Sequence, residues 1–228
     1  MLVTLSRERS DTHKRRWIQG GVMSFSCRIA AVAGLSCAIA GFAPASAADE
    51  ADRYPGAHWY VGTGIGPGFG AKYKLNGQSI TFDDRLQGAT DKSPLLALNI
   101  VNAGIALSPT LLFGFSGSAV ARTGKLAGND THLQINNYLA ALTWFPAEKG
   151  FFVRGGAGLS NILVDTGVSS DRVNGFGILV GAGYALPVAR RHNITFTADY
   201  SRQSYSGSST KPDSSQFGAV YLGYMYRR

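Results

Sequence analysis

The sequence predicts an all-β protein, an eight-stranded antiparallel up-and-down transmembrane β-barrel preceded by a signal peptide. Three observations support this fold class: a strand-like alternation of side chains, its recurrence in eight segments, and an export leader ahead of them. The alternation is clearest in residues 172–188, where apolar side chains occupy the even positions from 176 to 186 and glycines occupy 175, 177, 181 and 183. A period of two is a strand signal and places the two sets on opposite faces of one sheet.

The composition excludes several classes of protein. With 228 residues, the chain is long enough for one or two domains. It is 45% apolar and only 16% charged, which does not suit a disordered chain. The net charge of +8 is partly carried by residues 1–47, and the remaining excess of Lys and Arg is scattered along the chain. We therefore expect no nucleic-acid partner.

The first part of the chain has the features of a secretory signal peptide. Residues 29–43 form an apolar run that follows Arg28 and ends shortly before an Ala-x-Ala sequence, which predicts cleavage after Ala47. The run is shorter than the roughly 20 residues that a membrane-spanning helix needs. Met23 offers an alternative translation start that would give the leader a short basic front.

Both cysteines, Cys27 and Cys37, lie inside this leader. The mature chain would then have no thiol, and hence no disulfide, no Cys-ligated zinc and no Cys nucleophile. The predicted organisation is a signal peptide at 1–47, a short polar segment at 48–56 and the barrel at 57–228.

Alternation of the same kind recurs along the mature chain. The eight predicted strands are 58–69, 95–107, 111–122, 131–145, 151–163, 172–188, 194–203 and 216–226. The long polar connection 70–93 contains Asn76-Gly77, a strong hairpin signal, and is expected to carry a small hairpin of its own. No helix is expected. Turns after the second, fourth and sixth strands are short, and loops such as 124–130 and 165–171 are longer, as in strands that run up and down.

Two further features favour a membrane over a soluble barrel. The strand lengths match the roughly 9 to 11 residues that cross a bilayer at a tilt. Aromatic rings gather near strand ends, where a membrane interface favours them. The rings expected at the interface are Trp59, Trp144, Phe151, Tyr184, Tyr224 and Tyr226. A soluble barrel with an oily interior has the same alternation, so the polarity of the faces does not decide between the two, whereas the export leader and the thiol-free chain favour the membrane.

The mature chain resembles the OmpA/OmpX-like family of small outer-membrane barrels. The resemblance is one of pattern and rests on the stretches FFVRGGAGLSN, VGAGYALPV and FGAVYLGYMY. It implies a location in the cell outer membrane, contact with outer-membrane lipid and lipopolysaccharide, a monomer and no cofactor.

Eight strands enclose a space just wide enough for side chains to fill, so we expect no broad pore. Arg122, Arg154 and Asp199 fall on the polar faces of their strands. We expect them to point inward and form ion pairs, because an unpaired buried charge is very costly. The alternative is that they gate a narrow solute channel.

The function is expected to be structural, or a surface interaction through loops, above all through 70–93, which carries Lys72, Lys74, Asp83, Asp84 and Arg85. Such loops would bind a surface ligand or a protein. The alternative is a lipid A-modifying enzyme, which would use His132 with Ser201, Ser204 or Asp130. No His-x-Ser pairing, carboxylate pair or metal-ligand spacing accompanies His132. We therefore predict no enzymatic activity and no catalytic, cofactor-binding or metal residues.

Overall fold

The computed structural model describes residues 58–147, 150–206 and 211–228. The predicted signal peptide at 1–47, its cleavage after Ala47, the alternative start at Met23 and the segment 48–56 lie outside the described residues. No helix among the described residues is both long enough and apolar enough to cross a membrane.

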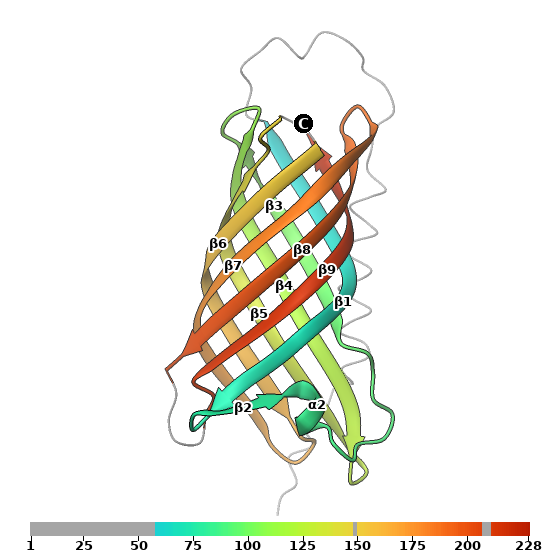
Figure 1. Ribbon diagram of the computed structural model, residues 1–228, viewed down its shortest axis with the longest axis vertical. Coiled ribbons are helices and arrows are strands. Elements are labelled where there is room, and N and C mark those ends of the chain that lie inside the picture. Colours follow the sequence, from blue (N-terminus) through green and yellow to red (C-terminus); the bar gives the residue numbers. More distant parts are fainter. Residues whose placement is uncertain (1–57, 148–149, 207–210) are drawn as a thin grey trace, which may run out of the picture. The chain divides into compact units, whose positions relative to one another are not determined.

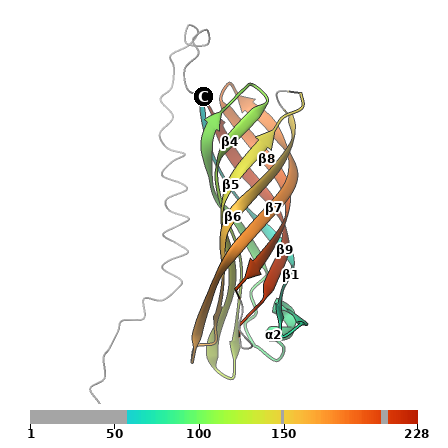
Figure 2. The same ribbon diagram turned by 90° about the vertical axis from the view of Figure 1, so that its left-hand side faces the viewer.

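The fold is a closed antiparallel β-barrel of eight long strands, as predicted (Figures 1 and 2). Each long strand pairs with the next along the chain, and β1 pairs with β9, where Tyr60 lies opposite Arg227 and closes the ring. The strands are β1 (Trp59–Leu75), β3 (Leu96–Ala106), β4 (Leu111–Leu126), β5 (Asn129–Trp144), β6 (Gly150–Asp165), β7 (Ser170–Ala189), β8 (His192–Tyr205) and β9 (Ser214–Arg227).

The connection between β1 and β3 is folded against the barrel. A tight turn at Asn76-Gly77, with both residues at positive φ, joins β1 to the short strand β2 (Gln78–Thr81), which confirms the predicted hairpin. A one-turn helix, α2 (Phe82–Arg85), follows, so the prediction of no helix is wrong at this point. Thr81 caps α2 and Phe82 is buried beneath it, a tertiary contact that local propensity does not reveal.

Two predicted loops are shorter than expected because strands extend into them. Only Ala127 and Gly128 separate β4 from β5, where a loop at 124–130 was expected, and four residues separate β6 from β7. The predicted contrast between short turns and long loops is therefore wrong at these two connections. Their polar residues face water beyond the membrane, and a solvated strand accommodates them as well as a loop does.

We call the end that holds Trp59 and Arg227 the inner end, and the opposite end, with β2 and α2, the outer end. Around the inner half, the outward side chains are large, apolar and exposed, and we call this surface the belt. Around the outer half, the outward positions are mainly polar or small, and we call it the collar. The belt includes Ile65, Phe69, Phe113, Phe115, Tyr138, Leu142, Leu159, Phe176, Ile178, Val180, Phe196, Tyr200, Val220 and Leu222.

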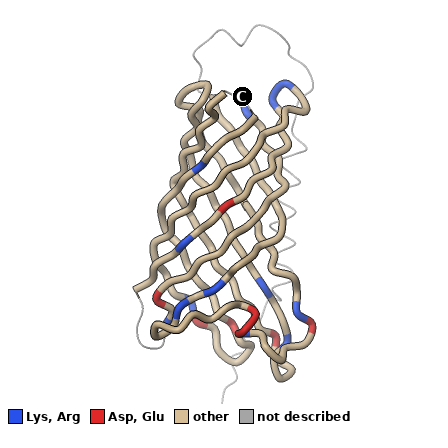
Figure 3. The backbone as a smooth tube through the Cα atoms, in the orientation of Figure 1, with Lys and Arg blue, Asp and Glu red and all other residues tan. Residues whose placement is uncertain are grey.

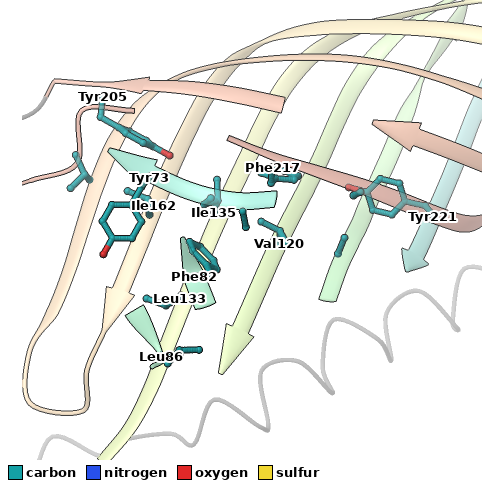
Figure 4. Packing of buried hydrophobic residues seen from close by; sticks show 14 residues of the cluster. Tyr73, Phe82, Leu86, Val120, Leu133, Ile135, Ile162, Tyr205, Phe217 and Tyr221 are labelled. Atoms are coloured by element: carbon teal, nitrogen blue, oxygen red, sulfur yellow. The ribbon is translucent and has the colours of Figure 1, made fainter. Parts of the chain in front are cut away.

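The interior changes in the opposite sense. In the outer half, apolar side chains point into the ring and pack beneath β2 and α2, among them Phe82, Val120, Ile135 and Phe217 (Figure 4). In the inner half, the interior carries buried Asn99, Ser116, Thr197 and Asp199 together with glycines. A smaller apolar cluster of Tyr60, Leu112, Phe145, Phe152 and Ala185 fills the inner end.

Candidate functional site

A buried ion pair crosses the interior of the inner half. Arg154 on β6 and Asp199 on β8 flank Gly181 on β7, which lies directly opposite both in the strand register. Arg154 donates two hydrogen bonds to the Asp199 carboxylate, and its Nε lies 2.9 Å from Oδ1. A Cβ on Gly181 would stand 2.0 Å from that oxygen. The glycine therefore lets the two charged side chains meet across the strand that separates them.

The ion pair is almost completely shielded from water. The side chain of Asp199 is fully buried, and that of Arg154 is 7% exposed. Arg154 Nη1 also lies 3.5 Å from Asn102 Oδ1 on β3, so the guanidinium ties together three separate parts of the wall. Removing either charge should destabilise the fold strongly, because the remaining charge would be buried without a partner.

Arg122 does not join this pair. It faces the interior of the collar, where its guanidinium forms an ion pair with Asp83 of α2 and its Nε donates to the Ser93 carbonyl at 3.2 Å. Its role is to hold the folded connection between β1 and β3 against β4. The strand pattern indicated the face on which Arg122 lies, but not its height along the barrel.

A layer of hydrogen-bonded polar side chains lies on the outer side of the ion pair. Gln203 on β8 donates to Asn137 Oδ1 at 3.1 Å and to Ser201 Oγ at 2.8 Å. Ser215 on β9 donates to Gln203 Oε1 at 2.6 Å and also bonds to the Tyr205 hydroxyl. The hydrogen-bonding groups of these buried side chains are paired with one another across β5, β8 and β9. The layer therefore connects these strands rigidly through the interior.

Beyond this layer, β2 and α2 lie in the wall between β1 and β4 at the outer end, and we call this segment the lid. Phe82 is 1% exposed and Leu86 is fully buried (Figure 4). The lid is capped by a reciprocal pair of hydrogen bonds, in which the Asp84 amide donates to Thr81 Oγ1 and the Thr81 amide donates to Asp84 Oδ2, both at 3.0 Å. These contacts with Thr81 hold the pKa of Asp84 below its ordinary value. The connection 70–93 therefore carries, besides the predicted hairpin, a helix that was not expected.

The inner end is closed by rings. Phe145 and Phe152 lie 5.2 Å apart between ring centres and pack with Leu112 and Tyr60. Between these rings and the ion pair lies a cavity of about 40 Å³ lined by Asn99, Asn102, Thr197 and Tyr221 among others. This volume holds a few water molecules and no larger solute.

The structure does not assemble the catalytic group considered for His132. His132 faces outward on β5, with Asp165 directly opposite on β6 and Asp130 two positions away on its own strand. Ser201 faces the interior, and Ser204 lies on β8, three strands away from β5 in the ring. No group of three or more potential metal-ligating His, Cys, Asp or Glu residues occurs within the described part of the chain.

The six aromatic residues that the sequence predicts at the interface lie at the inner end of the belt. Trp59, Trp144, Phe151 and Tyr184 are exposed, whereas Tyr224 and Tyr226 are half-buried. Trp59 packs on Tyr226 with 5.1 Å between ring centres, and Tyr224 bonds to His192. A second set of exposed rings marks the boundary between belt and collar: Phe69, Tyr138, Phe176 and Tyr200. Its sequence signal is a ring two or three positions from an outward polar side chain: the polar residue follows the ring on β1 and β8 and precedes it on β5 and β7.

The closed sheet and the apolar belt define the class of the protein. In hydrocarbon every backbone polar group must be satisfied within the protein, and a closed barrel does this without exposing an edge. The chain therefore has the fold of a small outer-membrane β-barrel of the OmpA/OmpX-like type.

Comparisons with known proteins agree with this class. No protein-family model matches the chain, and no curated protein matches it. Among solved structures, the crystal structure of Neisserial surface protein A (NspA) matches with a TM-score of 0.50 and 16% identity, over 75% of this chain and 98% of that one. Ail, the attachment invasion locus protein of Yersinia pestis, solved with the heparin analogue sucrose octasulfate, has a TM-score of 0.46 and 14% identity, over 75% and 99%. The similarity to NspA is one of fold.

Proposed function

We propose that this protein is a non-conducting, non-enzymatic outer-membrane barrel that acts by presenting its rigid collar at the cell surface. The observation that carries the proposal is that the interior is closed at both ends and braced between them. Apolar side chains, Phe82 and Leu86 among them, fill the interior of the outer half, Phe145 and Phe152 fill the inner end, and the ion pair spans the middle.

The collar has the properties of a surface for interaction. Charged residues gather at the outer end, opposite the C-terminus, and the wall between the two ends carries few (Figure 3). The strands continue into the collar and are joined there by tight connections such as Ala127-Gly128, so the surface is ordered before any partner arrives. A preordered surface loses little conformational entropy on binding.

The orientation places the outer end outside the cell. Both barrel termini lie at the inner end, and the two longest connections, between β1 and β3 and between β8 and β9, lie at the outer end. Small outer-membrane barrels have short turns on the periplasmic side and longer loops outside the cell. Ala127→Cys at a collar hairpin should react with a membrane-impermeant maleimide on intact cells. Arg191→Cys, in an inner turn, should react only after lysis. The reverse labelling would overturn the orientation and with it the proposal.

The closed interior predicts no ion conduction. The full-length barrel, refolded into planar lipid bilayers, is expected to show no conductance steps. A variant with Phe82→Ser, Leu86→Ser and Phe152→Ser loosens both ends and serves as a positive control for detecting any path. Regular steps from the wild-type protein would contradict the proposal.

The enzymatic alternative predicts a change in lipid chemistry. Lipid A from cells with and without the gene should have the same masses, since His132 has neither Ser201 nor Ser204 within its part of the wall. Gain or loss of an acyl chain that depends on His132 would show that the barrel is an enzyme.

A further inference from the structure

The chain contains two Asn-Gly sequences, Asn76-Gly77 and Asn174-Gly175. Asparagine is a thermally labile residue. It is most reactive before glycine, because a glycine has no Cβ to hinder the approach of its backbone nitrogen to the asparagine side-chain amide. The two sequences have the same local chemistry, so a difference in their reactivity has to come from the fold. The structure places them in opposite surroundings.

Asn76-Gly77 is the exposed two-residue connection between β1 and β2. β1 ends at Leu75 and β2 begins at Gln78, and these two residues lie opposite each other, so the two turn residues stand outside the ladder. Both turn residues are exposed, with φ of 51° and 78°. A Cβ on Gly77 would meet no atom within 4 Å apart from its chain neighbours. Water therefore reaches this turn, and the Asn76 side chain has space to rotate.

Asn174-Gly175 lies inside β7 and has a paired strand on each side. Gly175 lies opposite Ser160 on β6 and opposite Tyr205 on β8. A Cβ on Gly175 would stand 2.1 Å from the Ser204 carbonyl oxygen and 2.5 Å from the Tyr205 ring. The Asn174 side chain is exposed, but the backbone nitrogen that would have to attack it is held in an extended strand. Attack at this site therefore requires the strands to separate locally.

We propose that Asn76 is a site of spontaneous hydrolytic deamidation in the folded protein, whereas the ladder protects Asn174. The Gly77 backbone nitrogen attacks the side-chain amide carbon of Asn76 and gives up its proton. The side-chain nitrogen leaves as ammonia, and a cyclic succinimide forms. Water then adds to one of the two ring carbonyls and opens the ring. The product is aspartate, or isoaspartate, in which the backbone continues through the side-chain carbon. The sum is one water consumed and one ammonia released, without a redox partner.

The two products affect the turn differently. Aspartate adds a negative charge at the exposed tip, and it tolerates the positive φ of position 76. Isoaspartate adds one carbon atom to the backbone of a connection whose geometry is set by two residues. The longer connection disturbs the pairing of Leu75 with Gln78 and loosens β2 at the start of the lid. Formation of isoaspartate at the tip therefore reaches the lid through the turn that leads into it.

Peptide mapping by mass spectrometry tests the proposal on the detergent-folded barrel, kept warm at mildly alkaline pH. Trypsin places the two Asn-Gly sequences in separate peptides, 75–85 and 173–190. In the folded barrel, Asn76 should deamidate at least about tenfold faster than Asn174, a ratio that corresponds to only about 1.4 kcal/mol of strand opening. In the urea-unfolded chain the two rates should be about equal, which shows that the fold causes the difference. Equal rates in the folded barrel, or no deamidation of Asn76 there, would overturn the proposal.

Limited proteolysis measures the consequence for the lid. The aged wild type is compared with fresh Asn76→Asp, which carries the new charge without the added carbon, and both must show the gel shift on heating that marks a folded barrel. The aged protein should be cleaved within 76–95 more readily than Asn76→Asp. Equal resistance of the two would overturn the effect on the lid. These outcomes do not depend on the orientation of the barrel or on conductance, so they are distinct from a failure of the proposed function.

Discussion

The inner and outer halves of this barrel are built from the same strands but have opposite polarity. In the inner half the outward side chains are apolar, and the interior holds the ion pair of Arg154 and Asp199. In the outer half the outer surface is mainly polar, and the interior packs Phe82, Val120 and Ile135. The inner half of the barrel thus has the polarity of a membrane barrel, and the outer half has the polarity of a soluble barrel.

The difference teaches that the solvent outside, rather than the sheet itself, sets the polarity of each face. Phe and Leu on the belt are stable in contact with lipid. The polar side chains of the inner half therefore point inside, where a charge is stable only when it is paired. Water around the collar accepts Lys, Asn and Gln, and the collar is then stabilised as a soluble protein is, by burying apolar side chains inside. The following variants test where one regime ends and the other begins.

The largest effect is expected from Asp199→Asn in the inner half. The substitution leaves the buried Arg154 guanidinium without its counter-charge and should lower the free energy of unfolding by about 3 to 5 kcal/mol. Urea unfolding of the lipid-refolded barrel measures it. A variant that removes both charges, Arg154→Met with Asp199→Leu, should lose less free energy of unfolding than Asp199→Asn does. If Asp199→Asn left the urea midpoint and the heat-modifiability unchanged, the ion pair would not stabilise the barrel.

In the outer half, Phe82→Ala removes the ring that anchors the lid. We expect closure of the lid to weaken by about 3 to 4 kcal/mol, the typical cost of deleting a buried Phe side chain. Limited proteolysis should then cleave within 76–95 while the wall stays resistant. Phe176→Ala, which shortens an exposed belt ring, is the control and should leave the lid protected; equal cleavage of both variants would contradict the role of Phe82.

The boundary between the halves is tested by placing Arg at two outward positions of β7. Val180→Arg puts the charge in the belt and should cost about 2 to 3 kcal/mol, because Arg is destabilising at bilayer depth. Asn174→Arg puts the same charge in the collar and should cost less than about 1 kcal/mol. Equal unfolding free energies for the two variants would mean that hydrocarbon does not surround Val180.

The smallest effect is expected at the turn that leads into the lid. Gly77 has φ of +78°, so Gly77→Ala should strain the turn by about 1 kcal/mol. Protease sensitivity of the lid should rise slightly, with the wall unchanged. Gly155→Ala is the matched control, since an added Cβ there meets no atom closer than 3.7 Å. If the control loosened the lid equally, the turn would not be the cause.

The sequence was sufficient to predict the eight strands, the hairpin at Asn76-Gly77 and the class of barrel. It was not sufficient for the collar, although a signal exists. Along β5 the even positions are apolar at Tyr138, Ala140, Leu142 and Trp144 but polar at Gln134 and Asn136, where the apolar side chains stand at the odd positions Leu133 and Ile135. This change of parity, which recurs at Ile162 on β6, marks the point where the oily face turns from lipid to the interior.

The candidate site was predicted in part for a related reason. Alternation shows which face of a strand a residue occupies, and it indicated an inward direction for Arg154, Asp199 and Arg122 alike. It does not show how strands are staggered, and the stagger places Gly181 between Arg154 and Asp199 while Arg122 meets Asp83. The contact between Arg122 and the lid also depends on α2, a helix too short for periodicity to reveal.

The tight connection at Ala127-Gly128 has a practical consequence. Paired strands run without interruption from the lipid to this tip, and Gly128 adopts a positive φ of 82° to make the turn. A peptide inserted between these two residues would be carried on a stiff stalk at a fixed height above the cell, with its ends held close together. The barrel thereby offers a scaffold on which foreign epitopes could be displayed in a constrained form.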